Sequence, residues 1–169
     1  MAEDFGQRVP YMMRMVSAAL SQELEAELRP FGLTHAQLAA LAQLGIEDPE
    51  ALSGATLGRR AGVTAQSMST AIASLLDRGL VVRAPNPEHG RRLDVRITDE
   101  GKALLARAQA ATAVVDERNL AALSADEQLE LRRMLRKMMN SLRLFLPSLP
   151  MTNSQGESEV EREVGRQRS

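Results

Sequence analysis

Small polar side chains gather on one face of a predicted helix that runs from Thr64 to Asp77. Its apolar residues recur at steps of three or four, as in a half-buried helix: Met68, Ile72, Leu75 and Leu76. The other face carries hydroxyls and one amide, on Thr64, Gln66, Ser67, Ser69, Thr70 and Ser74. No acid precedes Asp77, whereas a helix face in water normally carries Glu and Lys. Such side chains can bond base edges and phosphates, so this face suits the major groove of DNA. An ordinary solvated helix face is the alternative.

Arginines surround this helix. Residues 53–99 contain seven arginines and four acids, whereas residues 1–52 contain eight acids and three bases. The net charge of −1 therefore conceals a basic middle segment, which is the candidate surface for a polyanion. Arg91 and Arg92 lie at a predicted hairpin tip, from which a guanidinium can enter a narrow minor groove. The others fit phosphate contacts or ordinary surface positions: Arg59, Arg60, Arg78, Arg83 and Arg96.

Residues for other kinds of chemistry are few. His35 and His89 lack a second ligand at the spacing of a metal site, and the chain has no cysteine. We find no phosphate-binding glycine loop and no nucleophile with its base, so we expect no enzyme, no cofactor and no metal. Arg14 lies among apolar residues, where it is a candidate for binding an aromatic carboxylate; a surface arginine is the alternative.

The elements that position these residues follow from local signals. A short helix over about 54–61 stops at Gly62, and the polar-faced helix then ends near Gly79, which predicts a helix-turn-helix. Two short strands follow, over 80–83 and 93–97, and the second alternates apolar and charged residues. The joining segment 84–92 contains two prolines and a glycine, so we expect a long hairpin loop, the wing.

Long amphipathic helices flank this lobe. The first carries an apolar stripe of Val9, Met13, Val16, Leu20, Leu24 and Leu28. Capping signals at Thr34, Thr98 and Ser124 open further helices. The last helix is striped with Leu131, Met134, Leu135, Met138, Leu142 and Leu146. Because such stripes would otherwise be exposed, we expect them to meet in a homodimer.

The predicted fold class is mostly α with a small β hairpin, a winged helix-turn-helix on a helical dimerisation platform. Residues 1–33 would form a dimerisation helix, 34–99 the DNA-binding lobe, 100–148 the other dimerisation helices, and 149–169 a disordered tail. Apolar residues make up 44% of the chain and aromatic residues only 2%. Without an apolar run of about 20 residues or a secretory signal, we expect no membrane contact and a cytoplasmic location.

The chain resembles the MarR family of bacterial regulators. The resemblance is most specific over residues 56–101, in the runs TLGRRAGVT, LLDRGLVVR and NPEHGRRLDVRITDEG. It implies intertwined terminal helices, two DNA-binding lobes on a palindromic operator, and often a small ligand between platform and lobe. Arg91 matches the family's wing arginine. Two positions depart from the family pattern, since His89 stands where an Asp is usual and Thr70 where an Arg is frequent.

The expected function is that of a sequence-specific DNA-binding transcriptional regulator, a ligand-responsive repressor that binds double-stranded DNA as a homodimer. Its effector would be a small molecule such as an aromatic acid. A winged-helix protein-interaction module without sequence-specific DNA binding is the alternative. Such a module would need neither the acid-free helix face nor the arginines of the loop.

Overall fold

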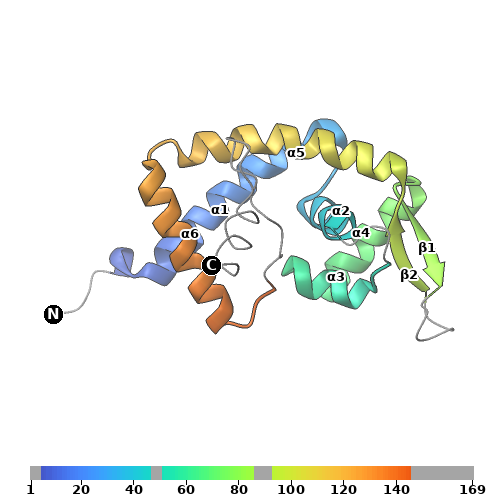
Figure 1. The fold of residues 1–169 in the computed structure, drawn as a ribbon, viewed down its shortest axis with the longest axis horizontal. Coiled ribbons are helices and arrows are strands. Elements are labelled where there is room, and N and C mark those ends of the chain that lie inside the picture. The colour runs from blue at the N-terminus through green and yellow to red at the C-terminus, as the bar shows by residue number, and fades with distance from the viewer. Residues whose placement is uncertain (1–4, 47–50, 86–92, 146–169) are drawn as a thin grey trace, which may run out of the picture.

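The computed structural model describes residues 5–46, 51–85 and 93–145. Along these ranges the elements are η1 (Phe5–Gln7), α1 (Val9–Leu28), η2 (Arg29–Phe31), α2 (His35–Ile46), α3 (Gly54–Ala61), α4 (Ala65–Asp77), β1 (Val81–Pro85), β2 (Leu93–Ile97), α5 (Asp99–Leu120) and α6 (Ala125–Ser141). The long helix α5 joins two parts of the molecule (Figure 1). Helices α1 and α6 lie toward one of its ends, and α3, α4 and the hairpin lie toward the other. The predicted fold class is confirmed.

Three helix starts follow the capping residues that the sequence indicates, and the structure adds a fourth cap at Thr64. Thr64 and Thr98 accept backbone hydrogen bonds from residues three positions later, at 3.1 and 3.0 Å. Thr34 forms a reciprocal pair with Gln37, and Ser124 forms a full capping box with Glu127. Each cap satisfies amides that the first turn of a helix leaves without partners.

The hairpin pairs β1 with β2 in antiparallel register, from Val81 opposite Ile97 to Pro85 opposite Leu93. The first strand is longer than predicted, because it includes residues 84 and 85 that we assigned to the loop. Pro85 is tolerated at the end of a strand, where its missing N–H removes no essential ladder bond. Leu52, also predicted as loop, exchanges two backbone hydrogen bonds of 2.9 Å with Val95.

The start of α5 lies directly on the turn between α4 and β1. The Thr98 amide donates to the carbonyl of Leu80 at 3.1 Å, and the Thr98 hydroxyl donates to that of Gly79 at 2.9 Å. Gly101 is buried in the first turn of α5. A Cβ at Gly101 would overlap the Leu80 carbonyl oxygen and lie 2.9 Å from Cγ1 of Ile97. Only glycine therefore permits this close contact.

The core of the lobe forms around α2, which packs against α3, α4 and α5. Its fully buried side chains come from every part of the lobe and from the end of α1: Leu28, Leu41, Leu44, Leu57, Met68, Leu75 and Val81. Aliphatic side chains fill this core, as the low aromatic content predicts. The core fixes α3 and α4 relative to the hairpin.

The last helix is shorter than its predicted stripe. α6 ends at Ser141, and the chain reverses at Arg143, whose φ is +55°. The amide of Leu144 then bonds back to the carbonyl of Met139 at 2.9 Å, a helix-ending pattern that usually employs glycine. Leu146 and the predicted tail lie outside the described residues. No helix in the described part of the chain is long and apolar enough to span a membrane.

Candidate nucleic-acid interface

The helix-turn-helix consists of α3, a tight turn and α4. The hydroxyl of Ser53 accepts a hydrogen bond from the Thr56 amide at 3.1 Å and so caps α3. Gly62 ends α3 with a φ of +67°, a conformation that favours glycine. Gly58 is buried, and a Cβ there would lie 3.6 Å from that of Met68. A Cβ at Gly58 would therefore make only ordinary contacts where α3 packs on α4.

Helix α4 has the two faces that the sequence predicts. Its buried residues are Met68, Ala71, Ile72 and Leu75. The polar residues exposed on its other side are Gln66, Ser67, Ser69 and Thr70. Its single acid is Asp77, the last residue of the helix. The exposed face therefore offers hydrogen-bonding groups without negative charge, which is what a helix in the major groove requires.

Two further residues of the predicted set are engaged within the protein. Thr64 is exposed and caps α4, and its hydroxyl also lies 3.1 Å from that of Ser67. Ser74 is half-buried and accepts a hydrogen bond of 2.8 Å from Nε2 of the buried Gln37. This bond joins α2 to α4, so Ser74 has a structural partner that the sequence did not predict. No local pattern could predict this bond, because Ser74 and Gln37 lie 37 positions apart along the chain.

The arginines of α3 lie in its last turn and have different surroundings. Arg59 is exposed, and its Nη2 donates to the Thr56 hydroxyl at 3.3 Å. Arg60 is half-buried, with its guanidinium 4.6 Å from the centre of the Phe145 ring. This is a cation–π contact between the lobe and the segment that follows α6. Arg59 is therefore the more accessible of the two for a phosphate.

Arg78 caps the end of α4, and its side chain is bonded to the segment that precedes the lobe. Its Nη1 donates to the carbonyl of Gly32 at 2.6 Å, and its Nη2 donates to that of Phe31 at 3.0 Å. Both carbonyls belong to the turn between α1 and α2. The sequence predicted a phosphate contact for Arg78 and contained no local signal for these bonds.

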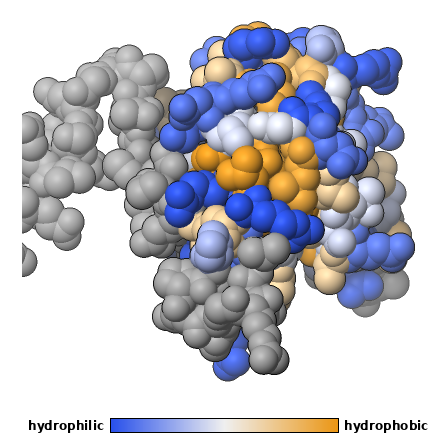
Figure 2. All heavy atoms as spheres, turned by 90° about the vertical axis from the view of Figure 1, so that its right-hand side faces the viewer, coloured by the Kyte–Doolittle hydropathy of each residue, from blue (hydrophilic) through white to orange (hydrophobic). Residues whose placement is uncertain are grey.

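The hairpin exposes Arg83 and Arg96. Val82 pairs with Arg96, and Arg83 pairs with Val95. Because paired residues share a face and neighbours alternate, the two arginines lie on opposite faces of the hairpin. Seen from the hairpin end of the molecule, an apolar patch lies between hydrophilic borders (Figure 2). His89, Arg91 and Arg92 lie outside the described residues, so their assigned roles remain predictions.

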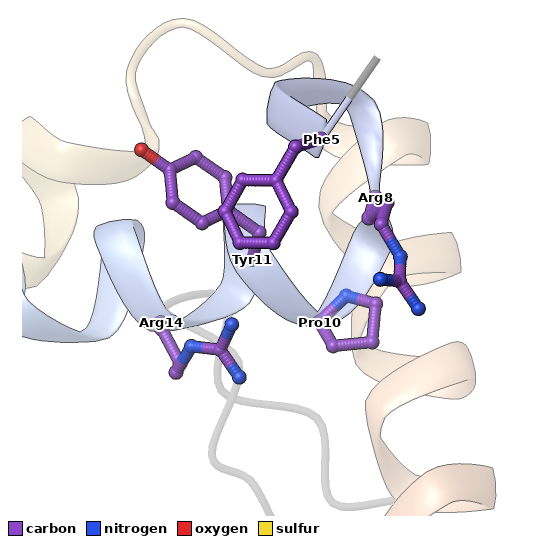
Figure 3. A pocket seen from close by; sticks show the side chains of 5 residues that line it. All are labelled: Phe5, Arg8, Pro10, Tyr11 and Arg14. Carbon is purple, nitrogen blue, oxygen red and sulfur yellow. The ribbon is translucent and has the colours of Figure 1, made fainter. Parts of the chain in front are cut away.

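A second group of residues surrounds a small cavity at the start of α1. Phe5, Arg8, Pro10, Tyr11 and Arg14 line a volume of about 150 Å³. The rings of Phe5 and Tyr11 lie 4.9 Å apart, and the two arginines lie on either side of Pro10 (Figure 3). The sequence indicated Arg14 alone. Tyr11 lies three residues from Arg8 and three from Arg14, a spacing at which neighbours on a helix can meet.

Large apolar side chains are exposed along α1 and α6. On α1 they are Val9, Met12, Met13, Met15, Val16 and Leu20. On α6 they are Leu129, Met134, Leu135 and Met138, and Leu142 and Leu144 follow. No residue of α6 is buried. Within the described residues no group of three or more His, Asp or Glu is placed to hold a metal ion.

Comparison with known proteins gives consistent matches. A model described as the MarR family matches residues 31–92. The HTH-type transcriptional repressor Rv2887 of Mycobacterium tuberculosis is 41% identical over 128 residues, which are 76% of this chain and 91% of that protein. Its solved structure in complex with salicylic acid has 39% identity and a TM-score of 0.66, covering 82% of this chain and 99% of the other. Its structure in complex with DNA has 37% identity and a TM-score of 0.63, covering 78% and 97%.

Proposed function

Since the chain belongs to the MarR family of DNA-binding transcriptional regulators, we propose that it is a ligand-responsive repressor that binds a palindromic operator as a homodimer. One observation of this chain carries the proposal: the exposed face of α4 is polar and has no acid before Asp77. MarR family proteins are regulators, and we propose that this chain has no catalytic activity. Its place of action would be the cytoplasm, where bacterial DNA lies.

The dimer would form through α1 and α6. Their exposed apolar residues form long stripes, which in a monomer would face water at a cost of about 25 cal/mol for each Å² of apolar surface. A second copy of the chain can cover them with the same residues, as two-fold symmetry requires. Residues 1–33 and 100–148 are then the platform, and residues 34–99 are the DNA-binding lobe.

DNA would be contacted by three parts of the lobe. Gln66 can make a bidentate contact to adenine, and Ser67, Ser69 and Thr70 reach base edges or phosphates with short side chains. Arg59 and one hairpin arginine fit phosphates beside the groove. Arg91 and Arg92 would enter the minor groove from the wing. Because the residues of α4 are short, wing contacts and DNA deformability would share the specificity.

The effector would be an aromatic carboxylate. The relative Rv2887 has been crystallised with salicylic acid, and two arginines and two aromatic residues line the pocket at the start of α1. Arg14 or Arg8 can pair with a carboxylate, and Phe5 or Tyr11 can stack on its ring. Such a ligand weakens DNA binding only if it binds better to a conformation in which the lobes do not fit the operator.

The proposal can be tested with DNA selected by the protein itself. A duplex selected from a random pool should contain an inverted repeat whose half-site centres lie about 10 to 10.5 base pairs apart. Fluorescence anisotropy should show tighter binding to this duplex than to random DNA, and salicylate should weaken the binding. Inserting about five base pairs between the half-sites should abolish tight binding, since it turns one half-site by roughly half a helical turn. Equal affinity for both duplexes at all salt concentrations would favour the protein-interaction module instead.

A further inference from the structure

The turn between α1 and α2 brings three helices together. α1 ends at Leu28, and η2 leads to Gly32, which has a φ of +60° and closes the turn by donating to the Arg29 carbonyl at 3.0 Å. The amide of Leu33 reaches back to the Leu28 carbonyl at 3.3 Å. The carbonyls of Phe31 and Gly32 lie at the end of this helical segment, where unbonded carbonyls carry partial negative charge.

The side chain of Arg78 binds both of these carbonyls. Its two terminal nitrogens lie 2.6 and 3.0 Å from the two oxygens, so the planar guanidinium makes a two-pronged contact. Arg78 caps α4, and the contact spans 46 and 47 positions of sequence. A Cβ at Gly32 would lie 3.8 Å from both nitrogens, which shows how closely the arginine covers this turn.

Two independent contacts join the same helices around this point. The guanidinium of Arg107, from α5, lies 5.8 Å from the centre of the Phe31 ring. The Gln37–Ser74 hydrogen bond ties the start of α2 to the last turns of α4. The end of α1, the end of α4 and helix α5 therefore meet at the turn of Phe31 and Gly32. The charged hydrogen bonds of Arg78 join the end of α4 to this turn.

We propose that Arg78 is a positioning residue that holds α4 at the angle to α1 that the operator requires, and that it does so without contacting DNA. The inference rests on the proposed placement of α4 in the major groove. With both terminal nitrogens on carbonyls of its own chain, Arg78 acts on DNA affinity through the direction of α4. A residue that acts in this way changes specific binding and leaves the number of phosphate contacts unchanged.

Salt dependence separates positioning from phosphate contact. Arg78→Ala should weaken binding to the selected operator by about tenfold, the effect of losing charge-assisted hydrogen bonds. The slope of log affinity against log salt should equal that of the parent, whereas Arg59→Ala should lower the slope by about one. Arg29→Ala is the matched control for net charge, since Arg29 is exposed in the same turn and its side chain has no bond to the described residues. This control should bind like the parent.

A conservative variant and random DNA complete the test. Arg78→Lys keeps the charge but cannot present the two-pronged group, so it should bind the operator nearly as weakly as Arg78→Ala. Binding of random DNA by either variant should stay within about twofold of the parent, since that binding depends on phosphate contacts. Affinities are calculated on total protein, so a loss of folded protein lowers both apparent affinities equally, and far-UV circular dichroism recognises it.

Three results would overturn the inference. They are a slope lowered by about one in Arg78→Ala, full operator binding by Arg78→Lys, and equal losses of operator and random-DNA affinity. The first two results would indicate that Arg78 contacts a phosphate. The third would indicate that Arg78 only stabilises the folded protein. Failure of the proposed function itself looks different, since the parent protein would then not distinguish operator from random DNA.

Discussion

The apolar residues of the lobe and those along α1 and α6 differ in how far they are buried. In the lobe, Leu41 and Leu75 have no exposed surface. In the platform, Val16 of α1 is 58% exposed and Leu142, after α6, is 65% exposed. The lobe therefore completes its core with the end of α1 and the start of α5 of the same chain, whereas α1 and α6 retain apolar surface that the described residues do not cover. The buried core would therefore hold the lobe together, and the exposed residues of α1 and α6 would set the distance between two lobes in the proposed dimer.

The largest effect should come from the lobe core. Leu75→Ala removes a fully buried side chain of α4 and should lower the free energy of unfolding by about 2–5 kcal/mol. Urea denaturation followed by circular dichroism measures this. Val82→Ala is the control on the same lobe, because Val82 is an exposed residue of β1. If both variants lost a similar free energy of unfolding, the distinction between the buried core and the exposed surface of the lobe would be wrong.

A charge on the platform should break the dimer and spare the lobe. Val16→Glu places a carboxylate within the proposed contact, where an unpaired buried charge costs several kcal/mol, so the dissociation constant should rise by at least about tenfold. Sedimentation at micromolar concentrations measures the assembly. Glu25→Gln, an exposed change on the same helix, should stay dimeric. A Val16→Glu protein that remains a dimer would place the interface elsewhere.

The Ser74 hydroxyl allows a sharper comparison within α4. Ser74→Ala leaves the buried Nε2 of Gln37 without its acceptor and should cost about 1–3 kcal/mol of stability. Its operator affinity, measured on folded protein, should change little. Ser69→Ala should do the reverse, since Ser69 is exposed on the same helix and would face DNA. Loss of operator affinity in Ser74→Ala at unchanged stability would restore the predicted base contact of Ser74.

The smallest effect concerns the capping box of α6. Hydrogen bonds from the Ser124 amide and hydroxyl lower the pKa of Glu127 below its ordinary value of 4.5. The folded state therefore favours the carboxylate, and this stabilisation is present above pH 4.5 and disappears as the pH falls through the lowered pKa. Glu127→Gln should be slightly less stable than the parent at pH 7. Thermal melts should show the difference shrinking towards pH 3; a constant difference would contradict the assignment.

Local signals in the sequence predicted much of this structure, and long-range contacts explain the rest. The predicted caps at Thr34, Thr98 and Ser124 depend on residues three positions apart, so residue type and spacing suffice to predict them. The roles of Ser74 and Arg78 depend on partners 37 to 47 positions away. No local pattern contains that information.

In the candidate site, too, some features follow from local spacing and others required the structure. The polar face of α4 follows from helical periodicity, and so its exposed residues were predictable. Three of the five residues around the Arg14 cavity also follow a helical spacing, yet the contribution of Phe5 required the structure, because η1 turns its ring towards Tyr11. The extent of the first strand was misjudged because proline and alanine are weak strand formers, and pairing with β2 outweighed their propensity.

The glycine at position 101 has a mechanical consequence. With no side chain between the first turn of α5 and Leu80, the helix packs directly on the hairpin end of the lobe, and we expect the two to tilt together. α5 has 22 residues and so extends roughly 33 Å at 1.5 Å per residue. A tilt of about 5° at its far end displaces the hairpin end by about 3 Å, which is close to the 3.4 Å rise of one base pair. If the proposed effector tilts α5 by a few degrees, we expect the lobe to shift by about the spacing of one base pair.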